Sequence, residues 1–185
     1  MANRNAAGRN SSNSAARGRA ASRIARTTST RRGAVNGRER RTKTEGAIRG
    51  GNGKYQFALA QVKDVPAGTG YSTSHGGVVE GKRMLVGYIH KERGTGSRMH
   101  THKNEQFNYV VRGTLVGSVN GKKVVAPAGT LIYIPANAPH TLVAAADDED
   151  VIFIAIKDLS QGIIGRAVDG TMTGPHFEKG FGPRD

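Results

Sequence analysis

Short runs of alternating apolar and polar residues dominate the chain from Lys54 onward. Successive side chains of a strand point to opposite faces of a sheet, so this period of two predicts strands with one buried face. Glycine, proline and asparagine separate the runs roughly every 8–12 residues, a spacing typical of all-β sandwiches and barrels. The predicted strands are Tyr55–Val62, Arg83–Lys91, Arg98–His102, Gln106–Val111, Leu115–Val119, Lys122–Ala126, Leu131–Ile134, Thr141–Ala145 and Val151–Lys157.

The residues between these runs predict the turns. Asn120–Gly121 indicates a two-residue hairpin, because both central positions of such a turn need a positive φ. Pro127–Gly129 and Pro135–Pro139 mark the next two corners. The glycine-containing segment Tyr71–Gly77 is predicted to be a loop. The chain shows no amphipathic helix and no repeat of the length that solenoids or propellers require.

The first 50 residues differ in composition from the rest of the chain. They hold 13 of the 28 lysines and arginines and only two acids, whereas residues 51–185 hold 15 basic and 12 acidic residues. Large apolar side chains are scarce in this first segment, so it cannot bury enough surface to offset the entropy of ordering its backbone. We therefore predict a disordered, arginine-rich tail over residues 1–50 and one all-β domain over residues 51–185.

Three interpretations of the tail stay open. A solvated, flexible leader is the simplest of them. Its arginine-, serine- and alanine-rich start also resembles an organelle transit peptide, although the scarcity of leucine and phenylalanine weakens the amphipathic helix that such a peptide needs. Its arginine clusters could instead bind nucleic-acid phosphates, without sequence readout because no aromatic residue is present to stack on bases.

The composition of the whole chain excludes several classes of protein. Cysteine is absent, so disulfides, thiolate metal ligands and a cysteine nucleophile are excluded. The longest apolar run, Val151–Ile156, is too short to cross a membrane. No apolar signal-peptide core follows the start, so we expect a soluble, cytoplasmic protein unless the tail directs it to an organelle.

The histidines follow a pattern that indicates a metal site. His100 and His102 are two residues apart, so in a strand both side chains leave the same face, about 7 Å apart. Gln106 keeps this parity after a short bend, and His140 lies in a proline-flanked turn that a folded sheet could return to the pair. Glu105 is the alternative ligand beside Gln106, because a carboxylate binds metal more strongly, but strand parity favours Gln106. Imidazole is a common ligand of zinc, copper, iron and nickel ions.

Two segments resemble the motifs of the cupin superfamily. Gly94–Gly113, which reads GTGSRMHTHKNEQFNYVVRG, is similar to the first motif, with its His-x-His pair and a third ligand. Gly121–His140, which reads GKKVVAPAGTLIYIPANAPH, is similar to the second motif, with Pro-x-Gly and a final histidine. The chain departs from the family at Gln106, where glutamate is usual, and at Ala144, where asparagine is frequent. The resemblance implies a double-stranded β-helix, a jelly-roll barrel with one divalent metal ion.

The resemblance also implies an activity. We expect a metal-dependent enzyme that acts on a small anionic or enolisable molecule, and we favour an Fe²⁺-dependent dioxygenase. A Ni²⁺-, Mn²⁺-, Zn²⁺- or Cu²⁺-dependent isomerase or lyase stays open, as does a cupin that binds a metal or small ligand without turnover. The resemblance further implies a homodimer.

Three more residues are candidates for catalysis. Arg98 shares the parity of His100 and could guide a carboxylate toward the metal, although an exposed arginine at a strand end would look the same. Tyr88 and His90 alternate together on the preceding strand and could supply a general acid or base. Half-buried positions in the barrel wall are the other interpretation of these two residues.

Overall fold

A computed structural model defines the fold of residues 41–170 and 174–183. The described residues all belong to one compact unit. Residues 1–40 lie outside the described residues, so the disorder of the tail stays a prediction for them. Within the described residues, no helix has the length and apolar character that a membrane crossing needs.

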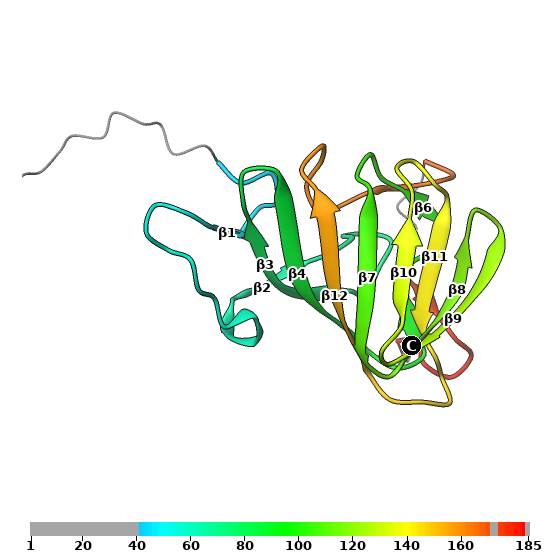
Figure 1. The fold of residues 1–185 in the computed structure, drawn as a ribbon. Coiled ribbons are helices and arrows are strands. Elements are labelled where there is room, and N and C mark those ends of the chain that lie inside the picture. Colours follow the sequence, from blue (N-terminus) through cyan, green and yellow to red (C-terminus); the bar gives the residue numbers. More distant parts are fainter. Residues whose placement is uncertain (1–40, 171–173, 184–185) are drawn as a thin grey trace, which may run out of the picture. The chain divides into compact units, whose positions relative to one another are not determined.

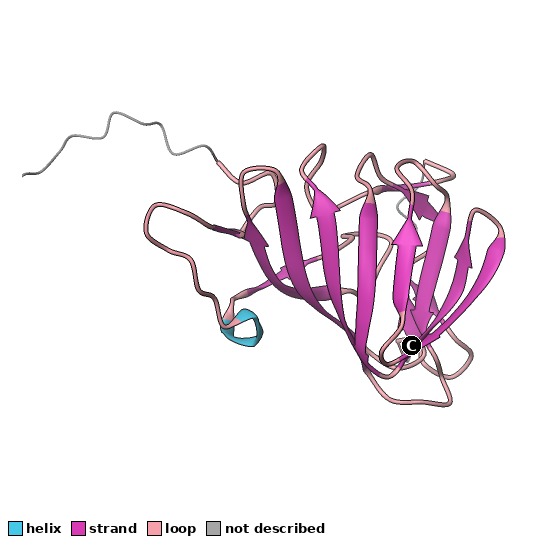
Figure 2. Ribbon diagram, in the orientation of Figure 1, coloured by secondary structure: helices cyan, strands magenta, loops and turns pink. Residues whose placement is uncertain are grey.

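Two seven-stranded sheets make up the domain (Figures 1 and 2). In the first sheet the order is β1-β3-β4-β12-β7-β10, and β2 pairs with β3. Long antiparallel ladders join β3 to β4, β4 to β12 and β12 to β7, so the centre of this sheet is regular. The bounds are β1 Ile48–Arg49, β2 Asp64–Pro66, β3 His75–Glu80, β4 Met84–Lys91, β7 Gln106–Arg112, β10 Leu131–Ile134 and β12 Val151–Asp158.

The second sheet is built around β11. Its order is β13-β6-β11-β5-β14, and β8 pairs with both β11 and β9. Buried apolar side chains from the two sheets, such as Leu85, Phe153 and Leu142, belong to one core cluster. The all-β jelly-roll fold that the sequence predicted is therefore confirmed. The bounds are β5 Thr95–Gly96, β6 His100–Thr101, β8 Thr114–Val119, β9 Lys122–Pro127, β11 His140–Ala144, β13 Arg166–Ala167 and β14 His176–Phe177.

Seven predicted strands are present, as β4 and β7 to β12, with bounds that differ from the prediction by at most one residue. The predicted Asn120–Gly121 hairpin is also confirmed, since both residues have positive φ values, of 49° and 73°. The predicted strand Arg98–His102 is shorter than expected, because β6 comprises only His100–Thr101, which pairs with β13 and, at His100, with β11.

Two predictions near the N-terminal edge are wrong. Tyr55–Val62 forms no strand but contains the 3₁₀ turn η1, Leu59–Gln61, because its alanine and leucine residues favour helical turns over extended backbone. The predicted loop Tyr71–Gly77 runs into strand β3, which begins at His75. The glycines in this strand permit close packing of backbones, since a Cβ atom at Gly76 would lie 2.0 Å from the carbonyl oxygen of Tyr88.

The folded domain also begins earlier than residue 51. β1 pairs in parallel with β3, and the buried carboxylate of Glu80 accepts hydrogen bonds from the main-chain N–H groups of Lys43 and Thr44, at 2.8 and 2.7 Å. The Thr44 side chain in turn accepts the N–H of Ile163 at 3.0 Å. Residues 41–50, which composition alone assigned to the tail, therefore belong to the domain.

The small side chain of Ala155 on the inner face of the first sheet leaves space inside the barrel. Ala155 on β12 pairs with Asn108 on β7 and lies between the larger side chains of Phe153 and Lys157 on its own strand. A cavity of about 40 Å³ borders all four of these residues. His100, Gln106 and His140 line this cavity as well.

Replacing the buried carboxylate Glu80 by alanine should lower the free energy of unfolding by about 2 kcal/mol or more, because two main-chain N–H groups lose their acceptor. Urea denaturation followed by circular dichroism measures the change. Glu45→Ala, at an exposed position of the same segment, is the matched control and should change stability by no more than about 0.5 kcal/mol. Equal effects of the two changes would contradict the anchoring role of Glu80.

Candidate metal centre

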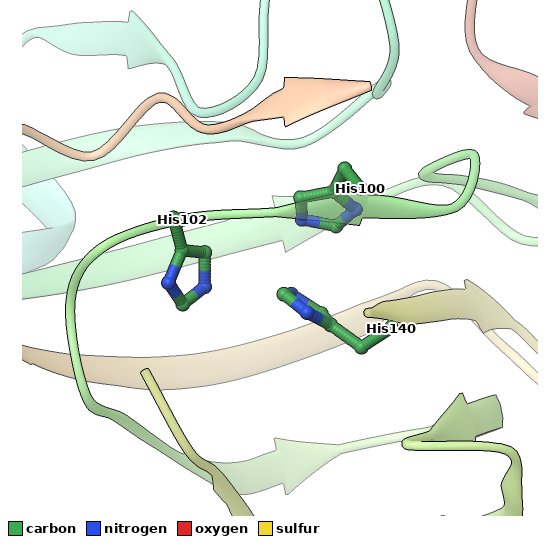
Figure 3. Close-up of side chains that lie close together, drawn as sticks. All are labelled: His100, His102 and His140. Carbon is green, nitrogen blue, oxygen red and sulfur yellow. The ribbon is translucent and has the colours of Figure 1, made fainter. Parts of the chain in front are cut away.

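The pairing of β6 with β11 brings three histidines together. His140, the first residue of β11, lies directly opposite His100 in the strand register, and His102 follows just beyond β6. The ring centroids of His100 and His140 are 4.0 Å apart, and those of His102 and His140 are 4.8 Å apart. One nitrogen from each ring lies within 4.8 Å of the other two, and the rings face a common space (Figure 3). The three histidines thus converge as the sequence predicted.

All three imidazole rings are oriented by the same type of hydrogen bond. In each ring Nδ1 lies 2.8 to 2.9 Å from a main-chain carbonyl oxygen two residues away. A carbonyl oxygen only accepts hydrogen bonds, so Nδ1 carries the proton and Nε2 keeps a free lone pair. Metal-bound histidines are commonly held in this way. The pairs are His100 with Arg98, His102 with Asn104, and His140 with Ala138.

Gln106 presents a fourth acceptor to the same space. It is the first residue of β7, it is buried, and its Nε2 donates a hydrogen bond of 2.6 Å to Oδ1 of Asn108. Neither Oε1 of Gln106 nor Nε2 of His102 has a hydrogen-bond partner among the described residues. Leaving a buried acceptor unpaired costs about 1–3 kcal/mol. A divalent cation would satisfy both atoms, so the residues present fit a metal ion.

The structure also separates Gln106 from its alternative, Glu105. The side chain of Glu105 is exposed, and its Oε1 accepts a hydrogen bond of 2.8 Å from the hydroxyl of Tyr133. The strand parity of β7 therefore directs the amide inward and the carboxylate outward. This placement supports Gln106 as the protein's oxygen ligand.

The bend between His102 and Gln106 is fixed by Asn104. Its buried side-chain amide donates hydrogen bonds to the carbonyl oxygens of Asp158 and Gln161, at 2.6 and 2.8 Å. The main-chain carbonyl oxygen of Asn104 accepts the Nδ1 proton of His102. Asn104 thereby sets the position of one metal-ligand candidate and the approach to the next.

Burial keeps the histidine cluster neutral. Desolvation, assisted by mutual repulsion, lowers the pKa of His100 to about 2, and desolvation with repulsion from Lys157 lowers that of His102 to about 3. Desolvation also lowers the pKa of His140 to about 4. At neutral pH all three imidazoles are therefore in the form that binds metal ions.

Two buried lysines line the same cavity as His100 and His140. Nζ of Lys91 donates a hydrogen bond of 2.6 Å to the carbonyl oxygen of Leu142, and Nζ of Lys157 donates one of 3.0 Å to that of Ile163. Desolvation lowers the pKa of each lysine to about 7. Among the described residues, neither ammonium group forms a salt bridge.

Tyr71 closes another side of the cavity. Its ring centroid lies 4.5 Å from that of His100, and its hydroxyl oxygen accepts the N–H of Gly165 at 2.7 Å. Burial raises the pKa of its hydroxyl to about 12, so this group stays protonated at neutral pH.

The structure does not bring the three predicted catalytic residues to this cavity. Arg98 is exposed and lines a separate groove beside His176. Its parity argument fails because the strand begins only at His100. Tyr88 and His90 are half-buried on the outer face of the sheet, where the His90 ring stacks on that of His75 at 5.7 Å.

Three residues that line the cavity were not predicted from the sequence, namely Lys91, Asn108 and Lys157. The alternation of inward and outward positions along their strands indicates that they face inward. On β4 the buried positions are Leu85, Gly87, Ile89 and Lys91, so the lysine faces inward and its polar neighbours face outward. Asn108 shares the parity of Gln106 in the same way, and Lys157 that of Phe153 and Ala155 on β12. The two lysines were overlooked because a charged residue at a strand end normally lies in solvent.

The comparison with protein families agrees with this geometry. Residues 87–157 match the family model of the cupin domain, and this segment contains the three histidines and Gln106. A cupin domain is therefore recognised within the chain, over residues 87–157. A search of curated proteins found no match to this cupin.

Solved structures similar to this cupin include a cupin protein from Bacteroides fragilis, with 24% sequence identity and a TM-score of 0.39 over 42% of this chain and 66% of that one. An RmlC-like cupin from Shewanella frigidimarina has 22% identity and a TM-score of 0.46 over 56% of this chain and 87% of that one. KdgF from a Halomonas species has 24% identity and a TM-score of 0.38 over 41% of this chain and 69% of that one.

His100→Ala or His140→Ala should abolish stoichiometric metal binding while the fold is retained, because each change removes one of the converging lone pairs. Gln106→Ala should weaken metal binding by about tenfold or more, since it removes the oxygen ligand. Inductively coupled plasma mass spectrometry gives the metal content, and circular dichroism gives the fold. Glu105→Ala is the matched control and should keep most of the metal. Loss of metal in Glu105→Ala but not in Gln106→Ala would reverse the ligand assignment.

The free energy of unfolding of the metal-free protein should rise as pH increases from about 7 to about 9.5. The pKa of Lys91 and of Lys157 is about 7 in the folded protein, below the ordinary value of 10.5, so the unfolded chain binds more protons over this interval. Stability must then increase with pH. Urea denaturation at several pH values measures this slope, and Lys91→Met should reduce it. If the free energy of unfolding of the unaltered protein does not change with pH over this interval, the burial of the two lysines without a counter-charge is contradicted.

Proposed function

We propose that this cupin is a metal-dependent enzyme that acts on a small anionic molecule inside the barrel. The observation that carries the proposal is the convergence of buried acceptors on one space. Three imidazole Nε2 atoms are directed there by main-chain hydrogen bonds, and Oε1 of Gln106 is left unpaired beside them. Such an arrangement is costly without a cation.

The protein supplies a neutral ligand set for that cation. His100, His102, His140 and Gln106 contribute no negative charge, so a divalent ion would keep its full charge in the cavity. A bound divalent metal supplies Lewis acidity that polarises substrate oxygens. Apolar residues such as Ile89 and Phe153 form part of the cavity wall, and an apolar surrounding strengthens the electrostatic interactions beside it.

Within this class we favour an Fe²⁺-dependent dioxygenase. Imidazole suits Fe²⁺, and a three-histidine set with a weak amide ligand resembles cupin dioxygenases. The small size of the cavity, about 40 Å³, would also limit the number of water molecules beside reactive species.

A non-redox isomerase or lyase is the second candidate. Lys91 and Lys157 are the observation that favours it, because each could hold or deliver a proton at Nζ to a substrate in the cavity. Such an enzyme would turn over without oxygen. A homodimer stays a prediction for either candidate.

Elemental analysis of natively purified protein, followed by assays on a panel of small carboxylic acids, tests the proposal. We expect about one divalent ion per chain, and oxygen uptake by the Fe²⁺-loaded protein that is lost in His140→Ala. Product formation under anaerobic conditions, followed by NMR, would instead favour the isomerase or lyase.

The remaining outcomes decide against an enzyme. Metal-loaded protein that converts no member of the panel, with or without oxygen, would favour a cupin that only binds its ligand. A correctly folded protein that takes up no divalent ion would overturn the metal-dependent function altogether.

A further inference from the structure

The charges inside the cavity are all of one sign. Lys91 and Lys157 are only 3% and 4% exposed, and no carboxylate lies among the residues that line the cavity. Asp158 is the acid that acts electrostatically on Lys157, but it is directed outward, where its carboxylate accepts the N–H groups of Glu105 and Ser160. The cavity therefore lacks a protein counter-charge.

Each ammonium group also has hydrogen-bond donors to spare. A lysine ammonium carries three N–H bonds. Lys91 and Lys157 each donate one hydrogen bond, to the carbonyl oxygens of Leu142 and Ile163. Burying a cation costs several kcal/mol unless an anion or further acceptors compensate it. Without such compensation each lysine loses part of its protonation near neutral pH, whereas an anionic ligand in the cavity would hold it in the charged form.

The two lysines approach the histidine cluster from different places. Lys157 lies directly opposite Gln106 in the pairing of β12 with β7, next to the metal-ligand candidates. Lys91 pairs with Val151 near the other end of the sheet, and its side chain reaches inward to the carbonyl of Leu142, two residues after His140. Both ammonium groups line the cavity and act electrostatically on His140, so an anion held by either of them would lie beside the histidine cluster.

The size of the cavity limits the anion. The part of the half-open cavity that water-sized groups can occupy is about 40 Å³, which favours a small planar anionic group over a bulkier one. A carboxylate has three non-hydrogen atoms, whereas a phosphate group has five. A charge-assisted hydrogen bond from a buried ammonium group to a carboxylate is among the strong polar interactions in proteins.

We propose that Lys91 and Lys157 form a binding site for the carboxylate group of a small organic acid, beside the histidine cluster. The inference deepens the proposed function, because it assigns the substrate class and the residues that recognise it. It rests on that function only for the role of the bound acid as substrate, since the two ammonium groups are present with or without metal.

Calorimetric titration of the full-length protein with formate and with formamide tests the site, in the metal-free and the metal-loaded state. These two probes have the same shape and size but differ in charge. Formate should bind saturably in both states, and formamide should bind at least about tenfold more weakly, because it lacks the charge that strengthens each hydrogen bond. Equal binding of the two compounds would overturn the proposal.

Lysine variants locate the site. Lys91→Met and Lys157→Met should each weaken formate binding by about tenfold or more, while the metal content per chain stays unchanged. Lys122→Met, at an exposed position on β9, is the matched control and should bind formate like the unaltered protein. Formate binding that survives both buried-lysine changes would overturn the assignment. Should those variants fail to fold, the comparison of formate with formamide still decides.

Three further outcomes distinguish a failure of the carboxylate site from a failure of the proposed metal-dependent function. Chloride that binds as tightly as formate would show a general anion site and overturn the assignment to carboxylates. Absence of formate binding in protein that carries one metal ion per chain would overturn this inference alone. Formate binding in a protein that takes up no metal would support the lysine site and overturn the proposed metal-dependent function.

Discussion

The cost of removing polar groups from water governs the interior of this barrel. A β-barrel of this kind is normally closed by apolar side chains, as it is here around Leu85, Ile89 and Val110. At one end of the same interior, imidazole, amide and ammonium groups are buried without enough partners among the described residues. Folding must offset that cost elsewhere, and bound ligands reduce it by supplying the missing charges and contacts. The site is therefore a destabilising feature of the fold that metal and substrate can compensate.

Main-chain carbonyl groups give the site its geometry. Each histidine ring is held by a carbonyl two residues away in its own chain segment, so the orientation is local and does not depend on another mobile side chain. The turn before β11 and the bend fixed by Asn104 place those carbonyls. Preorganisation of this kind means that a metal ion would meet ligands already in position, and little ordering entropy would be lost on binding.

The sequence predicted those parts of the structure that follow from local pattern. Period-two alternation identified the regular strands, and the spacing of His100, His102 and Gln106 identified the ligand candidates because parity needs no long-range information. The sequence did not reveal that His75–Glu80 is a strand, since its two glycines are explained only by the backbone packed against them. It also missed Lys91 and Lys157, whose importance depends on the cavity beside Ala155 that only the folded sheet creates.

The departure from the family motif at Gln106 is consistent with these lysines. Lys157 lies opposite residue 106 in the strand register. A glutamate at this position would introduce a carboxylate beside a buried ammonium group, and the two would form an ion pair within the barrel. That carboxylate would offset one unit of the positive charge in the cavity, and it would occupy donors that an incoming acid needs. With glutamine, the oxygen ligand is retained while the positive charge of the cavity stays available to substrate. The amide at residue 106 and the two lysines are therefore parts of one electrostatic arrangement, in which the substrate rather than the protein provides the negative charge.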